Sequence, residues 1–145
     1  MKTGSLCMDE DRHLRYRDKI FWIHGRADLI ETWIKESDGV LKTDTKTTLA
    51  IFQAFHEITE ATMDCISMFL HDNQQPARDD YSNIDRIDLF SPDQKQLLHG
   101  MNGMRNRIIH QYNGTDESLI LAGIEQSLPE IRSLALVIEE WINRA

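Results

Sequence analysis

The chain has few of the residues that interrupt helices. Of its 145 residues only 3 are proline and 7 are glycine, and runs in which β-branched residues alternate with polar ones are nearly absent. Proline and glycine are the strongest breakers of regular local structure. We therefore predict an all-α fold, an up-and-down helical bundle of four to six helices.

Cysteines, long apolar runs and net positive charge are also lacking. The 2 cysteines, Cys7 and Cys65, have neither the density of a disulfide scaffold nor a metal-ligand spacing, so Cys65 is interpreted as a core residue and no metal or cofactor is expected. No apolar run could cross a bilayer and the start lacks a signal peptide's apolar segment, which predicts a cytoplasmic protein without membrane contact. Because the net charge is −8, any RNA contact must be local.

What the chain does have is enough apolar residues for one core. With 41% hydrophobic residues, we expect a single domain over residues 11–145 after a flexible segment 1–10. Apolar residues at spacings of 3 and 4 predict one helix from about Asp9 to Glu36 and a second from Thr43 or Asp44 to about Asp72. Gly39 should take the left-handed conformation after the first helix. The predicted core stripes are Ile20, Ile23, Ala27, Ile30 and Ile34, then Phe52, Phe55, Thr59, Thr62, Ile66 and Phe69.

The second half of the chain begins with a predicted loop over residues 72–80 and a short helix from Tyr81 to Phe90. The run 91–94, Ser-Pro-Asp-Gln, combines a capping serine, a proline at the first helical position and a glutamine that completes a capping box. A helix should therefore run from there to about Tyr112. The last helical region should start after a cap at Thr115 or Asp116 and bend or restart at Pro129.

In projection, the helix that starts at Ser91 places Arg105 inside an arc of apolar residues, and Tyr112 shares that stripe. A guanidinium among core residues loses hydration unless it meets a carboxylate, a phosphate or several carbonyls. One interpretation is purely structural, with Arg105 paired to an acidic residue of the bundle such as Asp64 or Glu60. The apolar residues of the arc are Leu97, Leu98, Met101, Met104, Ile108 and Ile109.

A second arc of the same helix holds His99, Gly100, Gly103, Asn106 and His110. Asn106 and His110 are four apart and should be neighbours on one face. Each glycine costs about 1 kcal/mol of helix stability relative to alanine and removes bulk beside this polar pair. The glycines either loosen the helix or admit another backbone, which could belong to this chain, to a second copy or to a nucleic acid.

Arginine and histidine together suit phosphoryl transfer. Histidine exchanges a proton near neutral pH, and arginine can hold a phosphate through two hydrogen bonds and offset charge in a transition state. RNA supplies its own nucleophile, the 2′-OH, so such a site needs neither a metal nor a protein nucleophile. From spacing alone, however, an arginine and a histidine five apart are more often structural.

Residues 105–112, Arg-Asn-Arg-Ile-Ile-His-Gln-Tyr, resemble the arginine, polar residue, spacer, histidine and tyrosine motif of HepT-like toxins in the HEPN superfamily. The run 50–58 resembles the second long helix of that family, and the likeness extends from about Arg12 to Trp141. The resemblance implies a HEPN-like bundle and a toxin ribonuclease that cuts RNA without a metal.

The resemblance also implies roles for the motif residues. Arg105 would hold the scissile phosphate, Asn106 would orient the phosphate or the histidine, and His110 would transfer a proton. Arg107 adds positive charge for RNA contact. Tyr112 would be the tyrosine that a minimal nucleotidyltransferase antitoxin modifies with AMP, which adds bulk and negative charge where RNA must enter.

The implied assembly is a homodimer in which two motif helices line one cleft. In this assembly Gly100 and Gly103 would form the surface at which the helices approach, and a two-fold axis would make that surface self-complementary. We then expect Arg105 to be partly buried at a subunit boundary and His110 to face a cleft. The alternative function is a catalytically inactive helical module that binds nucleotide or RNA for a nucleotidyltransferase.

Overall fold

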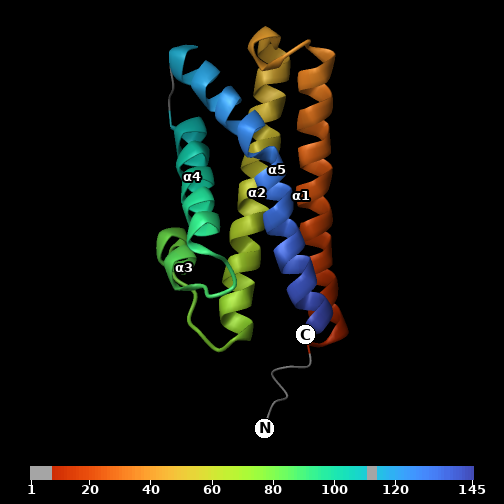
Figure 1. Cartoon of the computed structure of the whole chain (residues 1–145), viewed down its shortest axis with the longest axis vertical. Helices are drawn as coiled ribbons and strands as arrows, with labels where there is room; N and C mark the ends of the chain where they lie inside the picture. Colours follow the sequence, from red (N-terminus) through yellow and green to blue (C-terminus); the bar gives the residue numbers. More distant parts are fainter. Residues whose placement is uncertain (1–7, 111–113) are drawn as a thin grey trace.

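The structure is a computed structural model that describes residues 8–110 and 114–145 (Figure 1). Within these ranges there is no strand, and no helix is long and apolar enough to cross a membrane. The all-α prediction is therefore confirmed. The helices are α1 (Glu10–Glu36), the 3-10 turn η2 (Val40–Lys42), α2 (Thr45–Asp72), α3 (Asp80–Arg86), α4 (Pro92–Ile109) and α5 (Gly114–Arg144).

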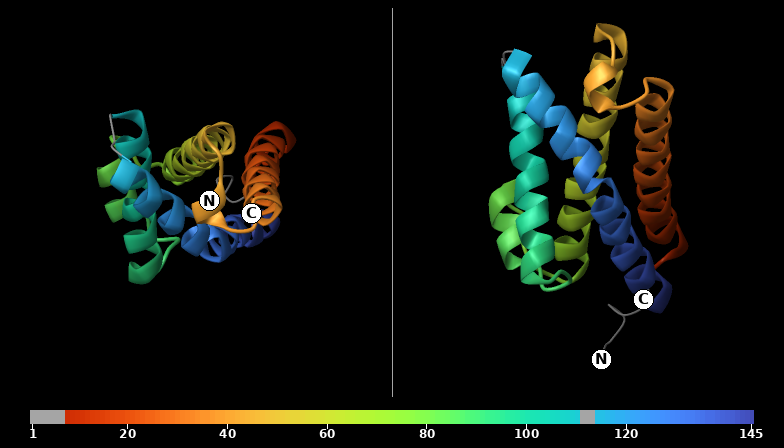
Figure 2. Two further views of the ribbon diagram at one scale, coloured as in Figure 1. Left: turned by 90° about the horizontal axis from the view of Figure 1, so that it is seen from above. Right: turned by 45° about the horizontal axis from the view of Figure 1, so that its top comes forward.

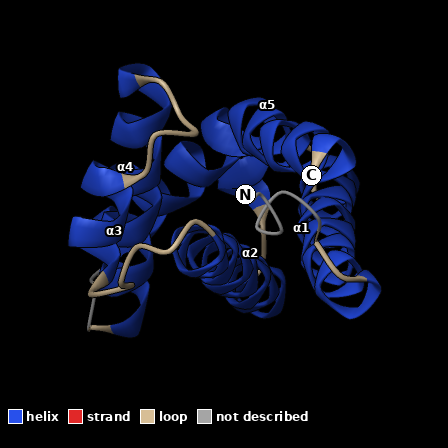
Figure 3. Cartoon of the chain, turned by 90° about the horizontal axis from the view of Figure 1, so that it is seen from below, coloured by secondary structure: helices blue, strands red, loops and turns tan. Residues whose placement is uncertain are grey.

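The four long helices alternate in direction along the bundle, and the short α3 lies beside the N-terminal end of α4 (Figure 1). Seen from above and from below, α3 and α4 lie on one side of α2 and α1 lies on the other (Figures 2 and 3). The helix α2 thus occupies the middle of the bundle. Its central place explains why buried residues occur around much of its circumference.

The predicted core stripes are confirmed. All five stripe residues of α1 and all six of α2 are buried, and so is Cys65, whose thiol pKa is raised to about 12 by burial. The second half adds Ile84, Ile87 and Phe90. One apolar core therefore runs through the bundle, as the periodicity predicts.

Local chemistry explains where most helices begin. Aspartates Asp9, Asp44 and Asp79 cap α1, α2 and α3 by accepting a hydrogen bond from a backbone N–H three residues on. The predicted capping box of α4 is present, since Ser91 and Gln94 exchange side-chain and backbone hydrogen bonds.

Several predicted boundaries are wrong. The short helix spans Asp80–Arg86, so Phe90 lies in the following loop. The helix α4 ends at Ile109, three residues before Tyr112, and α5 already begins at Gly114. After α1 the left-handed residue is Asp38, with φ of 58°, whereas Gly39 has φ of 124°.

The helix α5 is continuous through Pro129, so this proline does not restart it. Figure 1 shows the helix changing direction about midway along its length, where light blue passes into dark blue. A proline has no N–H for the preceding turn and its ring pushes that turn away, which bends a helix. Of the two outcomes expected at Pro129, the bend is the one observed.

A polar contact joins the start of α1 to the end of α2. The Asp72 carboxylate accepts hydrogen bonds from the Tyr16 hydroxyl at 2.7 Å and from Arg12 Nε at 2.9 Å. Tyr16 is fully buried, and desolvation together with the Asp72 carboxylate raises the pKa of its hydroxyl far above the ordinary range. Asp72 therefore satisfies a buried donor that the core could not otherwise accommodate.

Candidate active site

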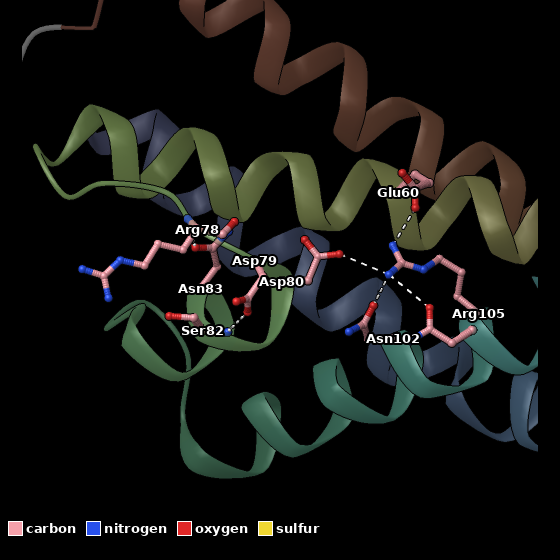
Figure 4. A network of polar contacts seen from close by, with 9 residues as sticks. Glu60, Arg78, Asp79, Asp80, Ser82, Asn83, Asn102 and Arg105 are labelled. Carbon is pink, nitrogen blue, oxygen red and sulfur yellow. Dashed lines mark hydrogen bonds and ion pairs between the residues drawn. The ribbon is translucent and has the colours of Figure 1, made fainter.

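The side chain of Arg105 is only 11% exposed, which confirms that it lies on the core-facing side of α4. It points into the space between α4, α2 and α3, where polar side chains from all three helices meet (Figure 4). The expectation of partial burial is met. That a second copy of the chain also covers Arg105, at a subunit boundary, stays a prediction.

Arg105 is paired with two carboxylates. Its Nη1 donates to Glu60 Oε1 of α2 at 2.6 Å, and its Nη2 donates to Asp80 Oδ2 of α3 at 3.1 Å (Figure 4). Glu60 is one of the two acidic partners expected on the structural interpretation. The other, Asp64, binds Lys19 of α1 at 3.1 Å instead. These contacts favour a structural contribution of Arg105.

Two amide oxygens of α4 complete the surroundings of Arg105. Its Nη2 also donates to Asn102 Oδ1 and, at a longer 3.5 Å, to Asn106 Oδ1. Asn102 is 2% exposed, and sequence analysis did not single it out. Its position three residues before Arg105, on the same side of the helix, was the available signal. The Nε of Arg105 is buried and has no hydrogen-bond partner in the described part of the chain.

His110 lies just beyond the last turn of α4. It is the C-cap, its backbone is extended with φ of −88° and ψ of 147°, and its N–H still donates to the Asn106 carbonyl. Its side chain is exposed. His110 thus lies one helical turn after Asn106, as predicted, and its extended ψ redirects only the chain that follows it.

Of the other two motif residues, Arg107 and Tyr112, the structure describes only Arg107. Arg107 is half exposed, and its contact with the described residues is a long one, 3.5 Å to Asp116 of α5. Tyr112, the predicted modification site, lies outside the described residues.

His99 belongs to a separate polar contact with α3. Its Nε2 lies 2.7 Å from Asp85 Oδ1, and its ring stacks on Tyr81 with centroids 5.0 Å apart. The histidine is thus held on the α3 side of α4. Although it shares an arc with Asn106 in projection, its described contacts are structural.

The two glycines of α4 leave their surface open. Gly100 is exposed and Gly103 is half-buried, and a Cβ added at either would meet nothing within 4 Å. No neighbour in the described part of the chain therefore requires a glycine at these positions. A role at a homodimer interface stays a prediction.

The described residues hold no group of three or more His, Cys, Asp and Glu side chains arranged to hold a metal ion. The ionisable groups gathered around Arg105 are carboxylates rather than cations. What the arrangement offers chemically is a restrained guanidinium, amides beside it and an exposed imidazole at the end of the same helix.

The sequence model of the family described as Ribonuclease HepT-like matches residues 23–138. The chain belongs to this family. The HepT-like match covers α2, α3 and α4 completely, about half of α1 and most of α5, so it includes every described motif residue.

Two relatives of this HepT-like chain come from Archaeoglobus fulgidus, and each carries the name "Putative RNase". One is 28% identical over 137 residues, which are 92% of this chain and 96% of the relative. The other is 28% identical over 110 residues, which are 72% and 80% of the two chains.

A solved structure has the same fold. The tri-AMPylated HEPN toxin of Shewanella oneidensis, in complex with an MNT antitoxin, aligns with a TM-score of 0.78 at 16% identity, over 92% of this chain and 99% of the toxin. The HEPN-like bundle expected from the motif is thus confirmed.

Proposed function

We propose that this HepT-like protein is the toxin of a toxin-antitoxin pair and a metal-independent endoribonuclease of the cytoplasm. The observation that supports the proposal is the match of residues 23–138 to the family described as Ribonuclease HepT-like, a range that contains the motif. Arg105 and Asn106 lie in hydrogen-bond contact on α4, and His110 lies exposed at the end of that helix.

In this proposal His110 takes the proton of a ribose 2′-OH. The 2′ oxygen then attacks the neighbouring phosphorus, the bond from phosphorus to the 5′ oxygen breaks, and the products are a 2′,3′-cyclic phosphate and a 5′-OH. The leaving 5′ oxygen takes its proton from water or from a second copy of the motif. Arg105 offsets charge on the phosphate, Asn106 orients it, and the exposed Arg107 binds a neighbouring phosphate.

The first test is cleavage of a mixed RNA substrate by the wild type and by His110→Ala. We expect loss of at least a hundredfold in rate, the usual contribution of a general base. His24→Ala, a change of the same type on α1 at the far side of the bundle (Figures 2 and 3), is the matched control and should keep full activity. Equal activity of the two variants would contradict the catalytic role of His110.

The proposed antitoxin is a minimal nucleotidyltransferase that silences the toxin by transferring AMP to Tyr112. Support comes from the solved relative, a tri-AMPylated HEPN toxin bound to an MNT antitoxin. Co-expression with a neighbouring nucleotidyltransferase should add AMP increments to the intact mass, and Tyr112→Phe should remove them. An unchanged pattern of increments in Tyr112→Phe would place the modification on another residue.

The proposed homodimer brings two copies of α4 together at Gly100 and Gly103. Since a Cβ at Gly103 meets no described residue within 4 Å, Gly103→Ala should stabilise a monomer by about 1 kcal/mol. At a close helix contact the same methyl group would weaken the dimer. Sedimentation measurements across a concentration series distinguish the two, and a stabilised protein of unchanged mass would argue against this interface.

A second candidate is a catalytically inactive module that binds nucleotide or RNA for a nucleotidyltransferase. The two carboxylates on Arg105 favour it, because they give the arginine a structural function that does not depend on catalysis. RNA binding without any cleavage by freshly purified protein would support this alternative over the ribonuclease.

A further inference from the structure

Glu60 lies on the boundary between the candidate site and an open groove. Its carboxylate binds Arg105 at 2.6 Å, and its side chain is 50% exposed. The same residue lines a groove of about 330 Å³ whose wall also contains Lys19, Trp22 and Asp64. Glu60 therefore contacts the motif arginine on one side and open space on the other.

The guanidinium of Arg105 has little capacity left for a phosphate. Its Nη1 is bound by Glu60, its Nη2 is shared by Asp80, Asn102 and Asn106, and its Nε is enclosed. A guanidinium holds a phosphate best through two parallel N–H donors. An RNA phosphate can obtain such a pair only if one of the present acceptors leaves.

Among these acceptors Glu60 is the easiest to release. Asp80 is 34% exposed and Asn102 is buried, whereas half of the Glu60 side chain already meets water. Ion pairs with a solvent-exposed partner contribute little stability, so rehydration offsets most of what is lost when Glu60 turns away. Asp80, by contrast, is less exposed, and its contact with Arg105 ties the short α3 to α4.

A second cation is available to the released carboxylate. Lys19 of α1 binds Asp64 at 3.1 Å, and Asp64 lies one turn after Glu60 on α2. Residues four apart on a helix are neighbours, and Glu60 and Lys19 line the same groove. When Glu60 leaves Arg105, its carboxylate can thus turn toward a second cation in the same groove.

The geometry points to Glu60 as a gate on substrate binding, an internal carboxylate that occupies Arg105 in the free protein and is displaced by the phosphate of an RNA strand. This inference rests on the proposed function, in which Arg105 contacts phosphate. A protein whose binding-competent form is a minor fraction binds with an affinity reduced by that fraction. Glu60 thereby sets the affinity for RNA without taking part in bond cleavage, and it acts as a positioning residue.

The test is the affinity of Glu60→Gln for a fluorescent 2′-O-methyl oligoribonucleotide, which cannot be cleaved because it has no free 2′-OH. Gln keeps the shape of the side chain but removes the charge that competes with phosphate. We expect a Kd about fivefold lower than that of the wild type, or ~1 kcal/mol.

The matched control is Glu57→Gln, which removes one negative charge from the same helix, where Glu57 accepts hydrogen bonds from Arg26 and Gln53 and contacts neither Arg105 nor Lys19. Its Kd should change by less than twofold. In an Arg105→Met background, Glu60→Gln should bring no gain, because the effect acts through the guanidinium. Equal melting temperatures of Glu60→Gln and Glu57→Gln exclude a general loss of structure.

A Kd of Glu60→Gln equal to that of Glu57→Gln overturns the gate, since only the net charge would then matter. A weaker affinity overturns it as well, because Glu60 would then hold Arg105 in its binding position. Tighter binding through Arg105 in a protein that never cleaves RNA would uphold the gate and reject the ribonuclease. The two proposals can thus fail separately.

Discussion

Replacement of Arg105 by methionine isolates the contribution of its charge, because methionine keeps most of the apolar stem. The change leaves Glu60, Asp80 and Asn102 without their donor. Both carboxylates are at least one-third exposed and recover water, so each contact contributes only about 0.5 kcal/mol. The Asn102 oxygen is enclosed, and a buried acceptor without a donor costs roughly 1–3 kcal/mol.

The expected total for Arg105→Met is a loss of about 2–4 kcal/mol in the free energy of unfolding. For a domain of this size that corresponds to a decrease of roughly 6–12 °C in melting temperature. Circular dichroism during heating and urea titration measure the two quantities. The matched control Arg107→Met removes a half-exposed arginine with one 3.5 Å contact and should change stability by less than about 0.5 kcal/mol.

Equal stability of the two variants would refute this reasoning, because it would mean that the contacts of Arg105 to α2 and α3 contribute nothing in solution. A loss above about 5 kcal/mol would refute it in the other direction, since such a value indicates a charge that water does not reach. The result also determines how activity data are interpreted. A loss of RNA cleavage in Arg105→Met demonstrates a catalytic role only at temperatures where the variant stays folded.

Three further predictions concern the bundle. Tyr16→Phe removes the hydroxyl that donates to Asp72 and should lower the free energy of unfolding in urea by about 1 kcal/mol. Burial raises the pKa of Glu57, but hydrogen bonds from Arg26 and Gln53 outweigh it and hold the pKa below its ordinary 4.5. The stability that ionised Glu57 contributes is therefore complete above pH 4.5 and is lost as acid protonates the carboxylate. Glu57→Gln should accordingly make the free energy of unfolding depend less on pH on the acid side. Cys65, buried with a pKa of about 12, should resist iodoacetamide at pH 8 until the protein unfolds, as peptide mass spectrometry will show.

The helices and their buried faces could be predicted from the sequence because they depend on local periodicity and caps. The stripe from Ile20 to Ile34 and the capping box at Ser91 are examples. The end of α4 could not be predicted in the same way. Ile108 and Ile109 continue the apolar pattern, yet Ile109 is exposed and the backbone turns extended at His110.

The candidate site was predicted in part. The projection placed Arg105 toward the core and the search for a counter-charge named Glu60, because both depend on spacing within helices. Asp80 was missed, since its approach to Arg105 depends on how the short α3 folds back on α4. No periodicity in the sequence encodes that approach. Partners that come from separate helices need the tertiary structure.

Arg105 of α4 contacts both α2 and α3, and this shared contact affects which parts of the bundle unfold together. A helix of seven residues such as α3 is too short to persist by itself, so its order depends on contacts such as that between Asp80 and Arg105. Local opening of α3 and loosening of the C-terminal half of α4 should then be one cooperative event. Amide hydrogen exchange would show it as matched protection in both segments, well below the protection of the centre of α2.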